Sequence, residues 1–111
     1  MSMAKAELAD RIRALLPPDE VVREQKMFGG IAFMLEGNML VGPMKDGSLL
    51  VRVGKEGMDK ALALPGASIM TMGSKTMTGF VVVSGDAIEE DFALGEWIDR
   101  AHTFVKTLPP K

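Results

Sequence analysis

The chain contains no cysteine and only one histidine among its 111 residues. Disulfides, thiolate nucleophiles, iron–sulfur clusters and cysteine-ligated zinc are therefore excluded. The single histidine, His102, has no second histidine or cysteine with which to hold a metal, and a catalytic role would need a converging nucleophile or carboxylate. We expect His102 to be a surface or boundary residue, and we predict no catalytic residue, no metal site and no cofactor.

A strong charge of either sign and a long apolar run are also missing. The net charge of −2 argues against an affinity that depends on neutralising many phosphates. A small basic patch is left open because bases outnumber acids between residues 26 and 79: Lys26, Lys45, Arg52, Lys55, Lys60 and Lys75 against Glu36, Asp46, Glu56 and Asp59. Residues 1–16 carry scattered charges where a signal peptide needs an apolar region, and no run approaches the length of a membrane span. We expect a cytoplasmic protein with no membrane partner.

The sequence does contain enough apolar residues for one modest core. Hydrophobic residues make up 47% of the chain and charged residues 25%, which is typical of a soluble globular protein. The length falls within the usual size of one domain. We therefore predict a single domain over residues 1–111.

Helical periodicity marks both ends of the chain. Residues 4–16 and 94–108 place apolar side chains at helical spacing, and each pattern ends at a pair of prolines. A capping box would start the last helix near Ala87, whereas a glycine within the pattern makes a start near Asp91 equally consistent. A shorter helix is predicted over residues 55–62.

The segments between these helices have the pattern of β-strands. Strands are predicted at residues 21–28, 68–72 and 79–83, and residues 31–53 form a meander with two tight turns. The pattern predicts an α+β fold: an antiparallel sheet of about five to six strands flanked by N- and C-terminal amphipathic helices, with a short helix between the strands.

The two turns set a register for the meander. Gly-Asn at 37–38 suits a two-residue turn with glycine first, and Asp-Gly at 46–47 suits a type I′ turn. If both loops have two residues, Val41 lies opposite Met34 on one side and Arg52 on the other. The same register places glycine at 42 opposite Phe33, where it leaves room for the aromatic ring.

Because side chains alternate across a strand, this register sorts the residues onto two faces. One face meets the helices and collects Ile31, Phe33, Leu35, Leu40, Leu49, Val51 and Val53. The other collects Ala32, Met34, Glu36, Met39, Val41, Pro43, Leu50 and Arg52. This second face is more apolar than a solvated face needs to be. We expect a partner to cover it, most simply a second copy of the chain.

Arg52 is the charge on this second face that most needs an explanation. The predicted register surrounds it with the candidate interface residues Met34, Met39, Val41 and Leu50. An unpaired charge there is costly unless it reaches water or a carboxylate such as that of Glu36. Snorkelling or a salt bridge is one interpretation, and contact with an anion or a partner is the other. Lys45 and Lys75, in loops beside the same region, are candidate members of such a site.

The motif Met27-Phe28-Gly29-Gly30 precedes the meander and raises the question of a phosphate-binding loop. No GxGxxG or GxxxxGK[ST] pattern surrounds it, and an extended strand follows where such loops lead into a helix. We interpret the two glycines as a bulge or bend that redirects the sheet.

The count of ten methionines is high, and Met70, Met72 and Met77 lie close together. Thioethers bind Cu(I), but no histidine or cysteine is present nearby to complete such a site. Core packing or an adaptable apolar interface is the favoured interpretation.

Three longer segments carry a family resemblance: KMFGGIAFMLEGNMLVGPMKDGSLLVRVGKE, ALALPGASIMTMGSKTMTGFVVV and WIDRAHTFVKTLPPK. Their most specific pieces are the MFGG motif, the arginine of LLVRV, the Pro-Gly-Ala at 65–67, Met77 with the following Gly-Phe, and the closing helix at 97–108. From about Arg23 to Lys111, the chain resembles the N-terminal domain of the TfoX (Sxy) family of competence regulators.

The resemblance implies a compact α+β domain and an association with transcriptional control of DNA-uptake competence. It brings no catalytic residues with it. Family members that carry the regulatory role typically add a C-terminal domain, whereas this chain ends with the first domain. The resemblance therefore implies a stand-alone regulator that works through protein contacts, or a relative without the competence role.

These observations predict a non-enzymatic regulatory and interaction module. We expect it to form a homodimer and to bind a protein partner in transcription regulation, without direct contact to nucleic acid. Direct nucleic-acid binding by the bases around Lys45, Arg52, Lys55 and Lys75 is the first alternative. An anion- or small-ligand-binding domain centred on Arg52 is the second.

Overall fold

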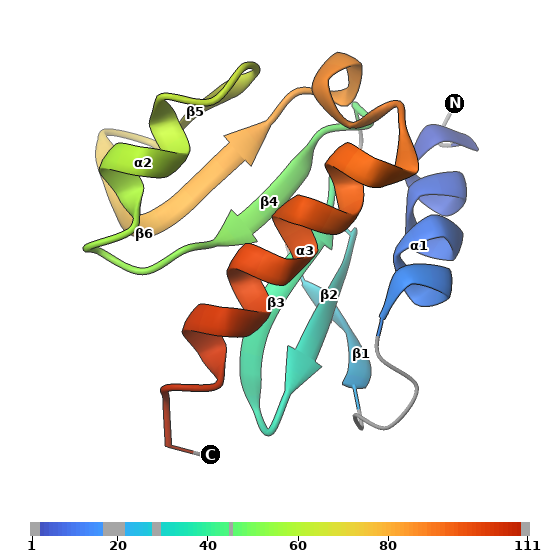
Figure 1. The fold of residues 1–111 in the computed structure, drawn as a ribbon, viewed down its shortest axis with the longest axis horizontal. Helices are drawn as coiled ribbons and strands as arrows, with labels where there is room; N and C mark the ends of the chain where they lie inside the picture. The colour runs from blue at the N-terminus through green and yellow to red at the C-terminus, as the bar shows by residue number, and fades with distance from the viewer. Residues whose placement is uncertain (1–2, 17–21, 28–29, 45, 110–111) are drawn as a thin grey trace.

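A computed structural model gives the fold of the chain (Figure 1). It describes residues 3–16, 22–27, 30–44 and 46–109, and within these ranges a six-stranded antiparallel sheet is flanked by helices. The elements in chain order are α1 (Met3–Leu15), β1 (Val22–Met27), β2 (Gly30–Leu35), β3 (Asn38–Pro43), β4 (Leu49–Arg52), α2 (Met58–Leu62), β5 (Ala67–Met72), β6 (Lys75–Val83), the 3₁₀-helix η1 (Gly85–Ile88) and α3 (Asp91–Val105). The predicted α+β fold is confirmed.

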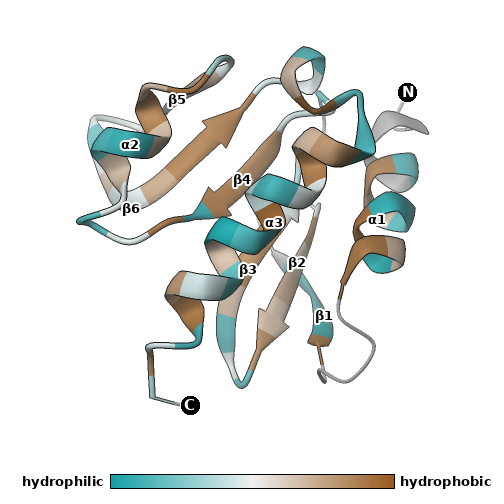
Figure 2. Ribbon diagram, in the orientation of Figure 1, coloured by the Kyte–Doolittle hydropathy of each residue, from teal (hydrophilic) through white to brown (hydrophobic). Residues whose placement is uncertain are grey.

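The helices cover one face of the sheet (Figure 1). α3 packs on β3 and β4 and contacts α1, while α2 packs on β5 and β6. Figure 2 shows the apolar residues of β4 and β6 running beneath them. The largest fully buried side chains are Phe33, Ile12, Leu40, Leu49, Ile88, Leu94, Ile98, Val41, Val51, Val81 and Val83. None of the helices in the described ranges has the length and apolar character that crossing a membrane requires.

The strands lie in the order β1-β2-β3-β4-β6-β5, so β1 and β5 form the two edges of the sheet. β6 is longer than predicted because it begins at Lys75, which lies opposite Met72 and forms a hairpin with β5. Lys75 is therefore a strand residue with an exposed side chain, and its prediction as a loop residue is wrong.

The junction before the last helix contains a separate 3₁₀-helix. The α-helix begins at Asp91, which confirms the later of the two predicted starts, and residues near Ala87 form η1 instead. Arg11 of α1 holds this junction in place. Its guanidinium donates to the carbonyl oxygens of Ile88 at 2.7 Å and Glu89 at 3.0 Å, and it pairs with the Asp91 carboxylate at 3.1 Å.

The β2–β3 turn lies one residue earlier than predicted. Its central residues are Glu36 and Gly37, whose φ angles of 52° and 83° fit a type I′ turn. Asn38 is instead the first residue of β3, opposite Leu35. Its buried side chain donates to the carbonyl oxygen of Pro109 at 3.0 Å and so ties the C-terminal segment to this hairpin.

The β3–β4 loop is one residue longer than predicted. The backbone N–H of Met44 donates to the carbonyl of Ser48 at 2.8 Å, so these two residues are the last to pair before the turn. Gly47 closes it with a φ of 86°, the left-handed conformation that ends a three-residue hairpin loop. The extra residue places Val41 opposite Val51, so the predicted pairing of Val41 with Arg52 is wrong.

A β-bulge in β3 changes the face of Val41. Met34 lies opposite Met39, but the next pair is Phe33 with Val41, so Leu40 is an extra residue on β3. Leu40 and Val41 consequently both pack into the core beneath the helices, and each is 0% exposed. The prediction that Val41 lies on the second face is wrong because the bulge interrupts the alternation of side chains.

The same bulge moves Gly42 away from its predicted position opposite Phe33. Gly42 lies opposite Leu50. A Cβ atom at this position would lie 3.1 Å from the terminal carbon of Met39 and 3.2 Å from the carbonyl oxygen of Ile31. The glycine therefore makes room for neighbouring strand atoms of the second face.

The MFGG motif falls partly outside the described residues. Met27 ends β1 and lies opposite Gly30, which begins β2. Phe28 and Gly29 belong to the part of the chain that the structure does not describe, and so does the predicted bend at that point. A strand follows Gly30, which agrees with the prediction that the motif does not lead into a helix.

Asp46 in the β3–β4 loop contributes to stability in a way that depends on pH. Its carboxylate accepts hydrogen bonds from the hydroxyl of Ser48 at 2.5 Å and from the Ser48 backbone N–H at 3.0 Å. These bonds lower the pKa of Asp46 from its ordinary value of 3.8, and the bond from the hydroxyl has the larger effect. A lowered folded-state pKa stabilises the protein above the unfolded-state pKa, and this stability is lost as the pH falls through the folded-state value.

We therefore expect Asp46→Asn to flatten the acid limb of the stability profile. The asparagine side-chain oxygen can still accept both bonds, but it does not titrate. The free energy of unfolding, measured with urea between about pH 7 and about pH 2, should fall less steeply below about pH 4 for Asp46→Asn than for the wild type. Identical slopes in this window would contradict the assignment.

Candidate interaction surface

The sheet carries a second apolar cluster on the side away from the helices, which we name the methionine face. It contains the buried residues Ala32, Met39 and Leu50 and the half-buried residues Met34, Met44, Met70, Phe80 and Val82. The buried members are only 1–6% exposed. The side chains of this face thus cover one another across the strands, and the half-buried members form its outer surface.

The predicted interface residues are only partly assembled here. Met34, Met39 and Leu50 lie together in the methionine face, whereas Val41 lies in the opposite core. Met70, from the methionine-rich segment, joins them. The methionine side chains are unbranched and polarisable, so they can adapt their shape to a contacting surface.

Arg52 lies at the end of β4, opposite Phe80 of the methionine face. Its guanidinium carbon lies 5.5 Å from the ring centre of Phe80 and 5.8 Å from that of Phe104 on α3. Among the described residues no carboxylate forms an ion pair with it, so the salt-bridge interpretation, for which Glu36 was the example, does not hold. Two aromatic rings hold this cation, and its N–H groups remain suited to a carboxylate or phosphate.

The basic residues predicted to accompany Arg52 do not form a described cluster with it. Lys45 lies outside the described residues. Lys75 lies beside the turn of the β5–β6 hairpin, whereas Arg52 is opposite Phe80, five residues further along β6. Arg52 therefore lies at the rim of the methionine face, and the structure places neither of these two lysines beside it.

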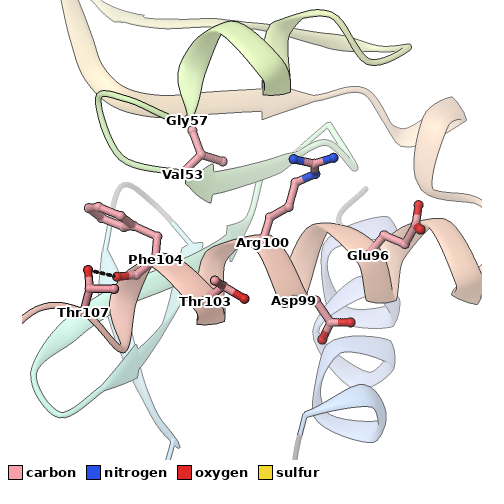
Figure 3. Close-up of a pocket in the computed structure, with 8 residues that line it drawn as sticks. All are labelled: Val53, Gly57, Glu96, Asp99, Arg100, Thr103, Phe104 and Thr107. Atoms are coloured by element: carbon pink, nitrogen blue, oxygen red, sulfur yellow. Dashed lines mark hydrogen bonds between the residues drawn. The ribbon is translucent and has the colours of Figure 1, made fainter.

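An open groove of about 530 Å³ runs along α3, on the helix side of the molecule (Figure 3). It is lined by Val53, Gly57, Glu96, Asp99, Arg100, Thr103, Phe104 and Thr107. Figure 3 shows the side chain of Arg100 extending from α3 towards β4. Its guanidinium carbon lies 5.7 Å from the ring centre of Trp97. The groove is thus polar along the helix and apolar at its floor.

Sequence reasoning missed the groove, although a signal for it was present. Its charged and hydroxyl residues recur at helical spacing along one exposed side of α3, a pattern that equally describes any solvated helix face. Its lining residue Thr107 donates its hydroxyl hydrogen bond to the backbone carbonyl of Phe104 at 2.6 Å and not to a carboxylate. Over the described residues, no group of three or more histidine and acidic side chains is placed to hold a metal ion.

The family to which this architecture belongs is decided by comparison with family models. The model of the TfoX N-terminal domain matches residues 14–105, which include every strand and all of α3. The chain belongs to the TfoX N-terminal domain family. The methionine face and Arg52 lie inside the matched TfoX segment. No curated protein matches the chain.

At the level of the family, membership assigns a competence-related regulatory domain. The TfoX N-terminal domain family is not a known enzyme family. The resemblance noted from the sequence is confirmed, and the TfoX fold places its adaptable apolar surface on the sheet, opposite the helices.

Proposed function

We propose that this TfoX N-terminal domain is a non-enzymatic regulatory module that acts by binding a protein partner through the methionine face. One observation carries the proposal: half-buried apolar side chains from four different segments form a continuous surface that no described helix covers. Methionine, phenylalanine and valine contribute contact area without charge, and methionine can repack against different partners.

Arg52 gives this surface a preference for acidic partners. The guanidinium is positioned by two rings at the edge of the methionine face. A carboxylate beside an apolar contact would accept bidentate hydrogen bonds from it. We therefore expect the partner segment to combine apolar residues with at least one Asp or Glu, and we propose that the partner belongs to the transcription machinery or its regulators.

Affinity capture with the full chain from an extract of the native host tests the proposal. Wild type, Met34→Glu and Thr103→Glu are compared, and the retained proteins are identified by mass spectrometry. Met34 is half-buried on the methionine face, and Thr103 is exposed in the α3 groove, so both variants add the same charge on opposite sides. We expect Met34→Glu to lose the partner, with affinity reduced at least about tenfold in a titration with the purified partner.

The control separates the two surfaces of the molecule. A partner lost with Thr103→Glu but retained with Met34→Glu would move the interaction to the α3 groove and overturn the proposal. A mobility-shift assay at low salt addresses the alternative of direct nucleic-acid binding. Retention of duplex or single-stranded DNA that weakens steeply with added salt would favour that alternative, because such binding depends on phosphate neutralisation.

A further inference from the structure

The two edges of the sheet differ in how they are protected. The outer strand β1 exposes Arg23, Glu24, Gln25 and Lys26, and charged side chains oppose pairing with another strand. The other edge strand, β5, has the sequence ASIMTM, which contains no charge and no proline. Ile69 in its centre is 49% exposed, and Phe92 is the only other large apolar residue so exposed among the described residues. β5 is therefore an edge with no sequence feature that prevents strand addition.

The ladder between β5 and β6 fixes which way the backbone of β5 points. The backbone N–H of Ser84 donates to the carbonyl of Gly66 at 2.9 Å, so these two residues form a hydrogen-bonded pair. Ser68 and Val82 lie two residues further along in the same register. In an antiparallel ladder hydrogen-bonded pairs recur at every second residue, so Ser68 directs its N–H and C=O groups towards β6.

The residues between these positions direct their backbone groups to the free edge. Ala67 and Ile69 alternate with Ser68, so their N–H and C=O groups point away from β6. Beyond the irregularity in the ladder, Met72 closes the hairpin opposite Lys75, and its neighbour Thr71 points outwards by the same alternation. The free edge thus offers the N–H and C=O groups of Ile69 and Thr71 and the C=O group of Ala67, whose N–H donates to the carbonyl of Leu64 at 3.3 Å.

We infer that β5 pairs antiparallel with β5 of a second copy of this chain, with Ile69 on the two-fold axis. An axis perpendicular to the sheet requires paired residues to lie on the same face, and the register centred on Ile69 meets this requirement. Ile69 then lies opposite Ile69 of the second copy, and Ala67 lies opposite Thr71. The Ile69 pair at the axis makes both bonds. Each Ala67–Thr71 pair makes one, from the Thr71 N–H to the Ala67 carbonyl, because the Ala67 N–H already donates to the carbonyl of Leu64 at 3.3 Å.

A second copy is the occupant that this edge fits best. In the register centred on Ile69 no charged residues meet, and the exposed isoleucine gains an apolar neighbour. The next residue, Met70, belongs to the methionine face, so pairing continues that face across the axis into the second copy. The inference goes beyond the proposed function and does not depend on it, because the dimer uses the edge of the sheet and leaves the methionine face accessible.

Sedimentation of the full chain tests the dimer. We expect the wild type to sediment as a dimer at micromolar concentration and Ile69→Lys to raise the dissociation constant at least about tenfold, because two added charges would meet at the axis. Phe92→Lys is the matched control, since it removes the other exposed apolar side chain from α3, and we expect it to remain dimeric. A monomeric wild type, or a dimer that Ile69→Lys does not weaken, would overturn the inference.

A disulfide trap tests the register, because the chain has no cysteine of its own. Cα atoms of a hydrogen-bonded antiparallel pair lie about 5.5 Å apart, within the range that a disulfide bridges. Ile69→Cys should therefore form a covalent dimer on mild oxidation. The Thr71→Cys thiols would lie about 13 Å apart in the same dimer and should not cross-link. Equal cross-linking of both variants, or none by Ile69→Cys, would contradict the pairing.

Discussion

Replacing Gly54 with alanine is expected to lower the free energy of unfolding by about 3 kcal/mol. Gly54 follows β4 with a φ of 81°, which costs an L-residue about 1–2 kcal/mol. A Cβ atom there would also lie 2.4 Å from the ring of Phe104. The backbone cannot yield freely, because the Gly54 N–H donates to the carbonyl of Gly79 at 3.0 Å. The Phe104 ring must therefore leave its position.

Gly73→Ala is the matched control for this prediction. Gly73 has a φ of 61°, but a Cβ atom there would meet nothing within 4 Å. Its replacement should cost only the backbone strain, about 1 kcal/mol. Urea denaturation of both variants separates the two contributions. If Gly54→Ala is no less stable than Gly73→Ala, the contact between Gly54 and Phe104 is not as close as the structure has it.

The position of Phe104 links this glycine to Arg52. The ring is one of the two that hold the guanidinium, at 5.8 Å, so displacing it removes half of the arginine's support. The chain thus uses a residue without a side chain to bring α3 against the end of β4. Sequence reasoning identified Arg52 as a charge that needs an explanation, but it did not identify Phe104 or Gly54. A contact between residues fifty positions apart leaves no local pattern.

The helices and most strands were predictable because their signals are local. Periodicity, paired prolines and the alternation of apolar residues predict α1, α3 and the meander without knowledge of the tertiary contacts. The start of α3 at Asp91 was one of two alternatives. The contact that fixes this junction, from Arg11, comes from the other end of the chain. Long-range contacts of this kind decide boundaries that local patterns leave open.

Most residues of the meander were assigned to the correct face of the sheet, although both of its turns were predicted wrongly. The bulge at Leu40 reverses the alternation in the rest of β3, and the extra residue in the β3–β4 loop reverses it again. Leu49, Val51 and Leu50 therefore lie on the faces that were predicted for them. Glu36, assigned to the second face, lies in the β2–β3 turn. Within the strands only residues between the two irregularities were misplaced, and Val41 is the one with the largest energetic consequence. Neither irregularity has a distinctive sequence signal.

The candidate interaction surface was also predictable only in part. Met34, Met39 and Leu50 were assigned to one apolar face by alternation alone, and the structure brings them together. Phe80 and Val82 joined the face only because β6 lies beside β4, which is a pairing of strands that are not consecutive in the sequence. The exposure of this apolar face was overestimated, because in a twisted sheet its side chains cover one another.

Val41→Lys should therefore destabilise the protein far more than Met34→Lys does. In the register predicted from the turns, the two residues lie opposite each other on one face, and a lysine at either should cost about the same. In the structure Val41 is 0% exposed in the core beneath α3, where a charged ammonium group has no described partner. Burying an uncompensated charge costs about 3–5 kcal/mol.

Met34 provides the control because it is half-buried at the surface of the methionine face. A lysine at this position can extend its ammonium group into water while its methylene stem covers the sheet, so we expect a loss below about 1.5 kcal/mol. Urea denaturation monitored by Trp97 fluorescence measures both variants. Equal losses would restore the register without the bulge. A large loss at Val41 alone would place Val41 in the core beneath α3 and so support the bulge, since the unbulged register puts this residue on the methionine face.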